Sequence, residues 1–193
     1  MAAPVSSLRK QTVLVAQKVI ERRPIYLDTE TTGLDKNAEI VEIAIIDDHG
    51  DTLYHSLVKP SQPIPADATR VHHITNEMVQ GSPNWFTLWP EVRGILQGRI
   101  IVIYNAEYDI RLMQQSYTRY AGQPYKDRFN AFDLLKLYSE FRGEWNSMRR
   151  AYKFHSLDDA GKQCSIKLPN AHRALADTLL TRAVLHHIAD TAL

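Results

Sequence analysis

A short apolar run near the middle of the 193-residue chain limits the fold more than any other feature. Residues 100–104 read Ile-Ile-Val-Ile-Tyr, with no charged side chain to face water. Such a run is typical of a strand buried on both faces, within a sheet that helices cover on each side. Residues 85–96 and 106–120 flank it with helical patterns, and Gly122 ends the second. The sequence therefore favours an α/β fold.

Three more strands are predicted ahead of this run, at residues 25–30, 39–47 and 52–59. They follow one another closely, with a turn signal at residues 48–51, so an antiparallel meander is expected. Residues 130–133 predict a short fifth strand. A meander followed by alternating helices and strands indicates one α/β domain with a mixed five-stranded sheet flanked by helices. Near the end of the chain, helices are expected from Ser156 to Cys164 and over residues 171–189.

The overall composition excludes several classes of protein but identifies no partner. The chain carries 23 basic and 22 acidic residues, so any nucleic-acid surface must be local. Its one cysteine, Cys164, rules out an intramolecular disulfide and a cysteine-type zinc site, and is expected to be buried. No apolar run reaches the length of a membrane-spanning helix, and the N-terminus lacks a secretory segment.

Residues 1–23 are predicted to form an amphipathic helix that extends a domain of residues 24–193 and ends at Arg23-Pro24. Its apolar stripe is expected to dock on the domain and consists of Val5, Leu8, Val15 and Val19. The basic residues of this segment also fit a mitochondrial transit peptide. We favour the docked helix and a cytoplasmic location.

Two carboxylates stand close together at the end of the first predicted strand. Asp28 and Glu30 are two residues apart, so their side chains point to the same face and repel each other. A divalent cation would remove this repulsion, because hard cations prefer oxygen ligands. A solvated strand end is the alternative explanation for any isolated Asp-x-Glu sequence.

A third carboxylate lies on the apolar stripe of the last predicted helix. Asp177 precedes Leu180, Val184 and Ile188 by three, seven and eleven residues, so this charge should face the sheet. It either meets a cation there or the helix is rotated from this estimate. Asp109 follows Asn105, a good N-cap residue, and could simply complement the helix dipole. His172 stands at the start of the last helix, where most single histidines are surface residues.

Three segments containing these residues resemble, in order, the motifs of the DEDDh exonucleases. Residues 27–34 (Leu-Asp-Thr-Glu-Thr-Thr-Gly-Leu) resemble the first motif and residues 104–109 (Tyr-Asn-Ala-Glu-Tyr-Asp) the second. Residues 172–177 (His-Arg-Ala-Leu-Ala-Asp) resemble the third, and residues 71–78 are similar to a family spacer. The sequence departs from the usual family residues at three positions. It has His73 where glycine is commoner, Tyr104 where histidine is frequent and Tyr108 where phenylalanine is frequent, and all the acids are kept.

The resemblance implies a ribonuclease H-like fold and a 3′→5′ exonuclease that releases 5′-mononucleotides with two Mg²⁺ or Mn²⁺ ions. It implies that Asp28, Glu30 and Asp177 are metal ligands, with Asp28 bridging both ions. Asp109 would contact the ions mainly through water, and His172 would be the general base. The family also implies a set of substrate-binding residues, which are Thr31, Gly33, Leu34, His73, Asn105 and Tyr108.

Several functions remain open at this point. The chain is similar to the catalytic domain of the proofreading (epsilon) subunit of bacterial replicative polymerase, but no long C-terminal tail follows the last helix, so we expect a stand-alone DNA exonuclease. A polymerase partner is not excluded, and the oligomeric state is open. The alternatives are an exoribonuclease like oligoribonuclease or ribonuclease T, and a non-catalytic nucleic-acid-binding or replisome accessory module. The non-catalytic module is disfavoured because all four acids and the histidine are present. A metal phosphatase on an unrelated fold is disfavoured by the order of the three motifs.

Residues 142–173 carry an excess of basic side chains that could hold phosphates. Three aromatic residues that could stack on bases are interleaved with them. An ordinary solvated loop and helix surface explains the pattern about as well. The basic residues are Arg142, Arg149, Arg150, Lys153, Lys162, Lys167 and Arg173, and the aromatic ones are Trp145, Tyr152 and Phe154.

Overall fold

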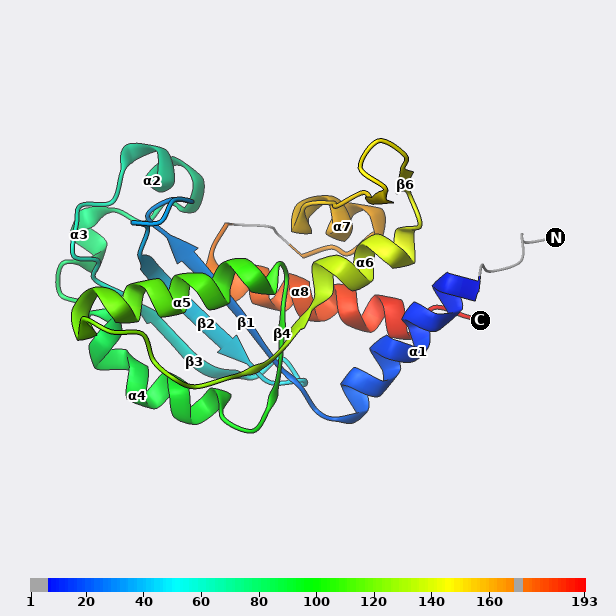
Figure 1. Ribbon diagram of the computed structural model, residues 1–193, viewed down its shortest axis with the longest axis horizontal. Coiled ribbons are helices and arrows are strands. Elements are labelled where there is room, and N and C mark those ends of the chain that lie inside the picture. Colours follow the sequence, from blue (N-terminus) through cyan, green and yellow to red (C-terminus); the bar gives the residue numbers. More distant parts are fainter. Residues whose placement is uncertain (1–6, 169–171) are drawn as a thin grey trace.

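The computed structural model describes residues 7–168 and 172–193 and contains a five-stranded sheet between two layers of helices (Figure 1). The strands of this sheet are β1 (Ile25–Thr31), β2 (Ile40–Ile46), β3 (Thr52–Leu57), β4 (Ile100–Ile103) and β5 (Asn130–Asp133). The helices are α1 (Ser7–Glu21), α2 (Ala66–His72), α3 (Asn76–Val79), α4 (Trp85–Leu96), α5 (Ala106–Ala121), α6 (Leu134–Arg142), α7 (Leu157–Gln163) and α8 (Ala174–Ala189). Two short strands, β6 (Trp145–Asn146) and β7 (Ala151–Tyr152), form a separate hairpin.

The sheet is mixed, as the sequence predicts, with strand order β3-β2-β1-β4-β5. β2 pairs antiparallel with β1 and with β3, which is the expected meander. β4 pairs parallel with β1 and β5, and its four residues are buried, which confirms the interpretation of the apolar run. Because β1 and β4 run in the same direction, both deliver the chain to the same edge of the sheet.

Alternation along the strands divides the interior into two cores. Tyr26 and Val102 face the layer that contains α1, α6 and α8, whereas Ile25, Leu27 and Ile101 face α4 and α5. Successive side chains of a strand point to opposite faces. The even-numbered residues of β1, which include Asp28 and Glu30, are therefore directed toward the layer of α8.

The N-terminal helix is docked as expected, but on a different stripe. In α1 the buried residues are Thr12, Val13, Ala16 and Val19. Val15 is exposed and Leu8 is half-buried, and Val5 lies outside the described residues. The helix packs against both α6 and α8, so the side that is covered lies between two neighbours and is rotated from the simple apolar stripe.

Several elements were not predicted, namely α2, α3, α6 and the β6–β7 hairpin. The helix α8 begins at Ala174 rather than at residue 171, which is outside the described part of the chain. Ser156 caps α7 by accepting a hydrogen bond from the backbone nitrogen of Asp159, and Cys164 is buried, both as predicted. No helix in the described ranges is long and apolar enough to cross a bilayer.

Candidate active site

Three predicted carboxylates meet where β1 ends against the first turn of α8. One oxygen from each of Asp28, Glu30 and Asp177 can be chosen so that all three lie within 4.8 Å of one another. The two residues of β1 share a face because they are two positions apart. Asp177 is 8% exposed on the buried stripe with Leu180, so the helix presents its charge to the sheet, as predicted.

The described residues compensate these charges only in part. The Oδ1 atom of Asp177 is buried and has no hydrogen-bond partner among the described residues. Burial raises the pKa of Asp177 to about 6. Burial, followed by the negative charges of Asp177 and Glu42, raises the pKa of Glu30 to about 8. Carboxylate oxygens that lie close together, one of them buried without a partner, fit a hard divalent cation.

Asp109 approaches from the other side of β1. This residue of α5 is 3% exposed, and its Oδ1 accepts a hydrogen bond of 2.7 Å from the hydroxyl of Thr29. Thr29 alternates with Asp28 and Glu30 and so points away from them. Burial raises the pKa of Asp109 to about 7. After burial, Asp109 is the largest influence that raises the pKa of Asp28 well above its usual value. The four acids thus form one electrostatic group around the end of a single strand.

His172 is exposed and stands two residues before α8, so the prediction that it starts the helix is wrong. Its backbone has a left-handed φ of 45°, and Arg173 rather than His172 takes the cap position. A charged imidazole here lowers the pKa of Asp177, against the effect of burial. The histidine is therefore next to the acidic group in space, as the resemblance implied.

Glu42 is a residue of this site that the sequence analysis missed. It is fully buried in β2 directly opposite Glu30, so the two side chains share a face. Arg173 donates two hydrogen bonds to its carboxylate, at 2.9 and 2.6 Å, and the backbone nitrogen of Ala174 donates a third at 3.0 Å. His55 Nε2 lies 2.9 Å from the same carboxylate. Burial opposes ionisation of Glu42, but these hydrogen bonds outweigh it and lower its pKa.

The ion pair of Glu42 and Arg173 fixes the start of α8 on the sheet, and with it Asp177. The sequence does contain a signal for Glu42, because this acid interrupts an otherwise apolar strand, Ile-Val-Glu-Ile-Ala-Ile-Ile. An acid in such a run is as costly to leave unpaired as Asp177 on its apolar stripe, so it indicates a buried partner.

A cavity of about 450 Å³ opens beside the acidic group. Glu30 forms part of its wall. Four of the predicted substrate-binding residues line it, namely Thr31, Gly33, Leu34 and Tyr108. The Tyr108 hydroxyl donates to the Gly33 carbonyl at 2.8 Å and also contacts the Thr31 hydroxyl at 2.8 Å. Leu34 remains 80% exposed at the rim, so the cavity has an apolar edge and a wall of hydrogen-bonded polar groups.

Two other predicted substrate-binding residues do not line this cavity. His73 is exposed and has a φ of 60°, at a position where the family more often has glycine. Its neighbour His72, which was not predicted, is buried and lines the cavity instead. Asn105 occupies the N-cap position of α5, as predicted, but its φ of 71° is left-handed and its side chain makes no capping hydrogen bond.

The metal-free protein should lose stability as the pH rises from about 5.5 to 8. The folded-state pKa values of Glu30, Asp109 and Asp177 lie above their unfolded values, so the folded chain binds more protons in this window. Their stabilising contribution is complete below the unfolded pKa and is lost as pH rises through the folded pKa. The measurement is the melting temperature in a chelator as a function of pH.

Glu30→Gln should flatten this pH dependence, because a neutral amide carries no proton that is lost. Glu21→Gln, at the exposed end of α1, is the control and should leave the slope unchanged. Identical slopes for wild type and Glu30→Gln would contradict the assignment of the raised pKa.

Arg173→Ala should lower the free energy of unfolding by about 3 kcal/mol, because it leaves the buried Glu42 carboxylate without its cation. Adding Glu42→Gln to that variant should restore part of the loss, since an amide is cheaper to bury than an unpaired charge. Arg93→Ala breaks a more exposed pair with Asp127 and should cost less than about 1 kcal/mol. Denaturant melts of the four proteins check this, and equal losses for Arg173→Ala and Arg93→Ala would refute it.

Comparison with known proteins places this geometry in a family. The chain is 41% identical over 179 residues to a protein of Escherichia phage 186 described as uncharacterized exonuclease CP81, covering 90% of this chain and 92% of that one. It is 30% identical to the DNA polymerase III subunit epsilon of Rickettsia felis, over 84% of this chain and 72% of that one.

A solved structure of exonuclease X in complex with 5′ overhanging duplex DNA matches with a TM-score of 0.65 and 27% identity, over 87% of this chain and 92% of that one. The ribonuclease H-like fold predicted from the motifs is confirmed. Residues 25–185 match the family model described as Exonuclease, and this range contains all four acids and His172. The chain therefore belongs to the exonuclease family, whose members depend on divalent metal ions.

Proposed function

We propose that this exonuclease removes nucleotides one at a time from the 3′ end of DNA, with two divalent cations, Mg²⁺ or Mn²⁺, held by its acidic group. One observation carries the proposal, namely the convergence of carboxylate oxygens from β1 and α8 within 4.8 Å. The buried Oδ1 of Asp177, which has no partner among the described residues, supports a ligand role for this atom.

The proposed roles follow from where each side chain lies. Asp28, Glu30 and Asp177 would be the direct ligands, and the influence of Glu30, Asp177 and Asp109 on the charge of Asp28 supports a central role for this carboxylate. Asp109, hydrogen-bonded to Thr29, would act through water. The chemistry that a pair of such ions supplies is stabilisation of the charge that develops on both oxygens of an in-line displacement at phosphorus.

His172 would accept the proton of the attacking water at its imidazole nitrogen. Its exposed position beside Asp177 supports this role, because the base must reach both water and the bound phosphate. Tyr104, an alternative base, is buried and donates its hydroxyl to the carbonyl of His155 at 2.9 Å. Burial raises the pKa of Tyr104, so it is unsuited to accept a proton near pH 7.

The cavity beside Glu30 would hold the terminal nucleotide. Leu34 at its rim offers an apolar surface to a base, and Tyr108 and Thr31 offer hydroxyl groups to the sugar. Similarity to an epsilon subunit and to exonuclease X, whose solved complex contains DNA, favours DNA over RNA. His73 and Asn105 stay proposed as substrate contacts outside this cavity.

We further propose that residues 1–23 extend an exonuclease domain of residues 24–193. The family match beginning at residue 25 supports this division, as does the position of α1 against α6 and α8 (Figure 1). Association with a DNA polymerase, by analogy with the epsilon relative, and a cytoplasmic location also stay proposals.

The decisive experiment combines metal removal with blocked ends. Activity on a labelled single-stranded DNA should vanish on exhaustive chelation and return with Mg²⁺ or Mn²⁺, because the carboxylates repel one another without a cation. An inverted 3′-terminal nucleotide should stop degradation, whereas a blocked 5′ end should not. Matched RNA should be degraded more slowly.

Asp28→Ala should abolish activity and also abolish the rise in melting temperature that the metal gives to wild type. Glu21→Gln is the matched control with full activity. Undiminished cleavage in chelator, or equal degradation of free and blocked 3′ ends, would refute the proposal.

His172→Ala should lower single-turnover cleavage by roughly 100- to 10,000-fold, the usual effect of removing a general base. Metal binding, read from the melting temperature, should be retained because His172 is not proposed as a ligand. The acid limb of the pH–rate profile should also change shape, since a base must be neutral to act.

His187→Ala, near the end of α8, is the matched control. A His172→Ala protein that keeps both its rate and its acid limb per folded molecule would show that this histidine only shapes the approach to α8.

A further inference from the structure

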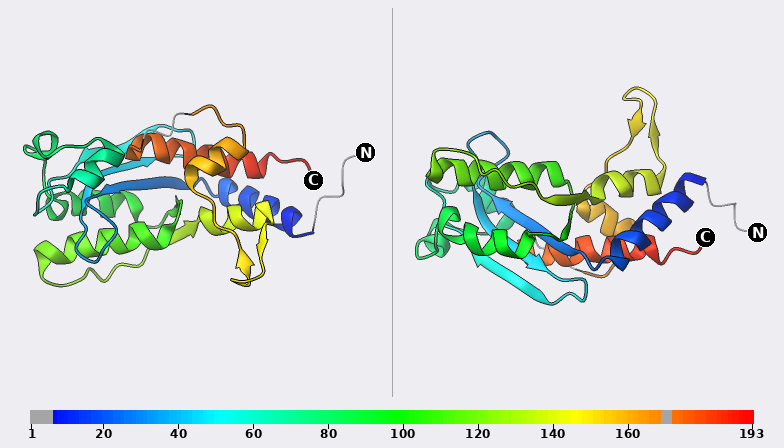
Figure 2. Two further views of the ribbon diagram at one scale, coloured as in Figure 1. Left: turned by 90° about the horizontal axis from the view of Figure 1, so that it is seen from above. Right: turned by 60° about the horizontal axis from the view of Figure 1, so that its bottom comes forward.

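The β6–β7 hairpin stands away from the body of the protein (Figure 2). It connects α6 to α7, and its strands pair through Trp145 with Tyr152 and Asn146 with Ala151. Two paired residues on each side are too few to hold a hairpin in water without further support.

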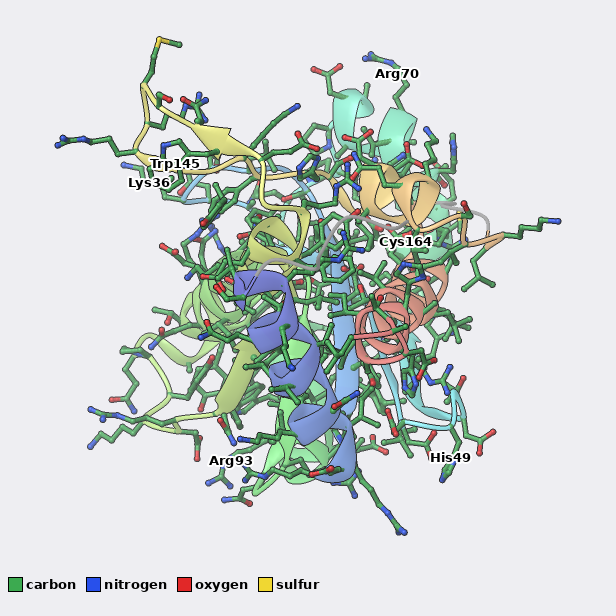
Figure 3. The ribbon with its side chains drawn as sticks, turned by 90° about the vertical axis from the view of Figure 1, so that its right-hand side faces the viewer. Lys36, His49, Arg70, Arg93, Trp145 and Cys164 are labelled. Carbon is green, nitrogen blue, oxygen red and sulfur yellow. The ribbon has the colours of Figure 1, made fainter. Side chains whose placement is uncertain are left out.

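Large apolar side chains are exposed along this hairpin. Trp145 is 57% exposed, Met148 94% and Phe154 59%. Figure 3 shows Trp145 on the hairpin at the outer edge of the molecule. The ring of Tyr152 meets Trp145 edge-on with 5.2 Å between centroids, which steadies the indole without covering it. Three such side chains within ten residues form a surface suited to binding.

The same segment is positively charged. Residues 145–154 contain Arg149, Arg150 and Lys153 and no acid. Lys153 lies 3.8 Å from Glu144, which also pairs with Arg142. Arg149 and Arg150 have no carboxylate partner among the residues that the structure describes.

The other predicted phosphate contacts in this part of the chain are mostly engaged. Lys162 pairs with Asp158, and Arg173 with Glu42. The basic surface expected over residues 142–173 is thus reduced chiefly to the tip of the hairpin. Cations and exposed rings together match a polyanion with stackable bases rather than an apolar protein face.

The root of the hairpin is fixed to the elements that carry the acids. Tyr104, directly before Asn105 and α5, donates its hydroxyl to the carbonyls of His155 at 2.9 Å and Ser156 at 3.3 Å. On the other side α7 packs on α8, where a Cβ on Gly161 would come within 3.0 Å of Leu180. The arm is therefore held in place relative to the active site although its tip is exposed.

We propose that the β6–β7 hairpin is a binding arm for the single strand upstream of the 3′ end. Trp145 and Phe154 stack on bases, and Arg149 and Arg150 contact phosphates. The identity of the ligand rests on the proposed function, but binding by the arm requires neither a metal nor turnover.

The three tryptophans give a direct test, because Trp85 and Trp89 are buried at 1% and 4% exposure and only Trp145 can reach a base. A single-stranded DNA of about 20 nucleotides, titrated in a chelator, should quench tryptophan emission. The signal should be absent in Trp145→Phe, although affinity is retained.

Affinity should respond to the hairpin side chains. Trp145→Ala should raise the dissociation constant roughly 5- to 100-fold, the range for losing one stacked base. Arg149→Ala combined with Arg150→Ala should lower the slope of log affinity against log salt by about 1.4, at about 0.7 for each phosphate contact on a single strand.

Matched controls remove similar groups elsewhere. Lys18→Ala with Arg22→Ala deletes two exposed charges of the N-terminal region, and Phe86→Ala deletes another exposed ring. Both should leave affinity and salt slope near the wild-type values. With metal present, cleavage of a dinucleotide should be unchanged in every hairpin variant, because no hairpin residue lines the cavity beside Glu30.

An unquenched Trp145, or losses of affinity no larger than those of the controls, would overturn the proposal. So would a hairpin variant that binds DNA normally but loses dinucleotide cleavage, which would indicate disturbance of the active site. If wild type binds and is quenched but degrades nothing, the proposed function fails and the arm stands.

Discussion

The pairing of Glu42 with Arg173 is the interaction on which the rest of the site depends. A carboxylate with no exposed surface in the centre of β2 is costly unless it is paired and hydrogen-bonded. Here it takes two hydrogen bonds from the guanidinium and one from the backbone of Ala174. These bonds lock the first turn of α8 onto the sheet at one height and one rotation. Asp177, three residues after Ala174, is consequently held beside Asp28 and Glu30.

That arrangement holds several carboxylates close enough to repel one another. Four carboxylates surround the end of β1, of which Asp109 and Asp177 are buried and Asp28 and Glu30 half-buried. Glu42 beside them is offset by hydrogen bonds from Arg173, whereas burial and the charges of Asp109 and Asp177 raise the pKa values of Asp28 and Glu30. The cores on both sides of the sheet hold the backbone rigid, so the acids cannot relax away from one another. A divalent cation relieves this strain where a rearrangement of the protein cannot, which links metal affinity to stability.

Much of the fold was predictable because strands and helices leave periodic patterns. The apolar run at Ile100, the meander and the buried stripe of Asp177 all reflect short-range geometry. Glu42 is visible in the sequence as an acid within an apolar strand, but its partner Arg173 lies 131 residues away, and no local pattern identifies that partner. The left-handed backbones of Asn105 and His172 were not predicted for a different reason, since a positive φ is uncommon for residues other than glycine.

The ladder between β1 and β2 explains how one strand serves both the acids and the cavity. Up to Glu30 the register is regular, and alternation sends Asp28 and Glu30 toward α8 while Thr29 reaches Asp109. Between Glu30 and Thr31 the register shifts, and such an irregularity bends a strand and redirects the next side chain. Thr31 then bonds to Gly33 and Tyr108, which forms the cavity wall immediately beside the last acid. A regular ladder would carry the strand straight on, so the irregularity helps to bring the cavity of about 450 Å³ against the carboxylates.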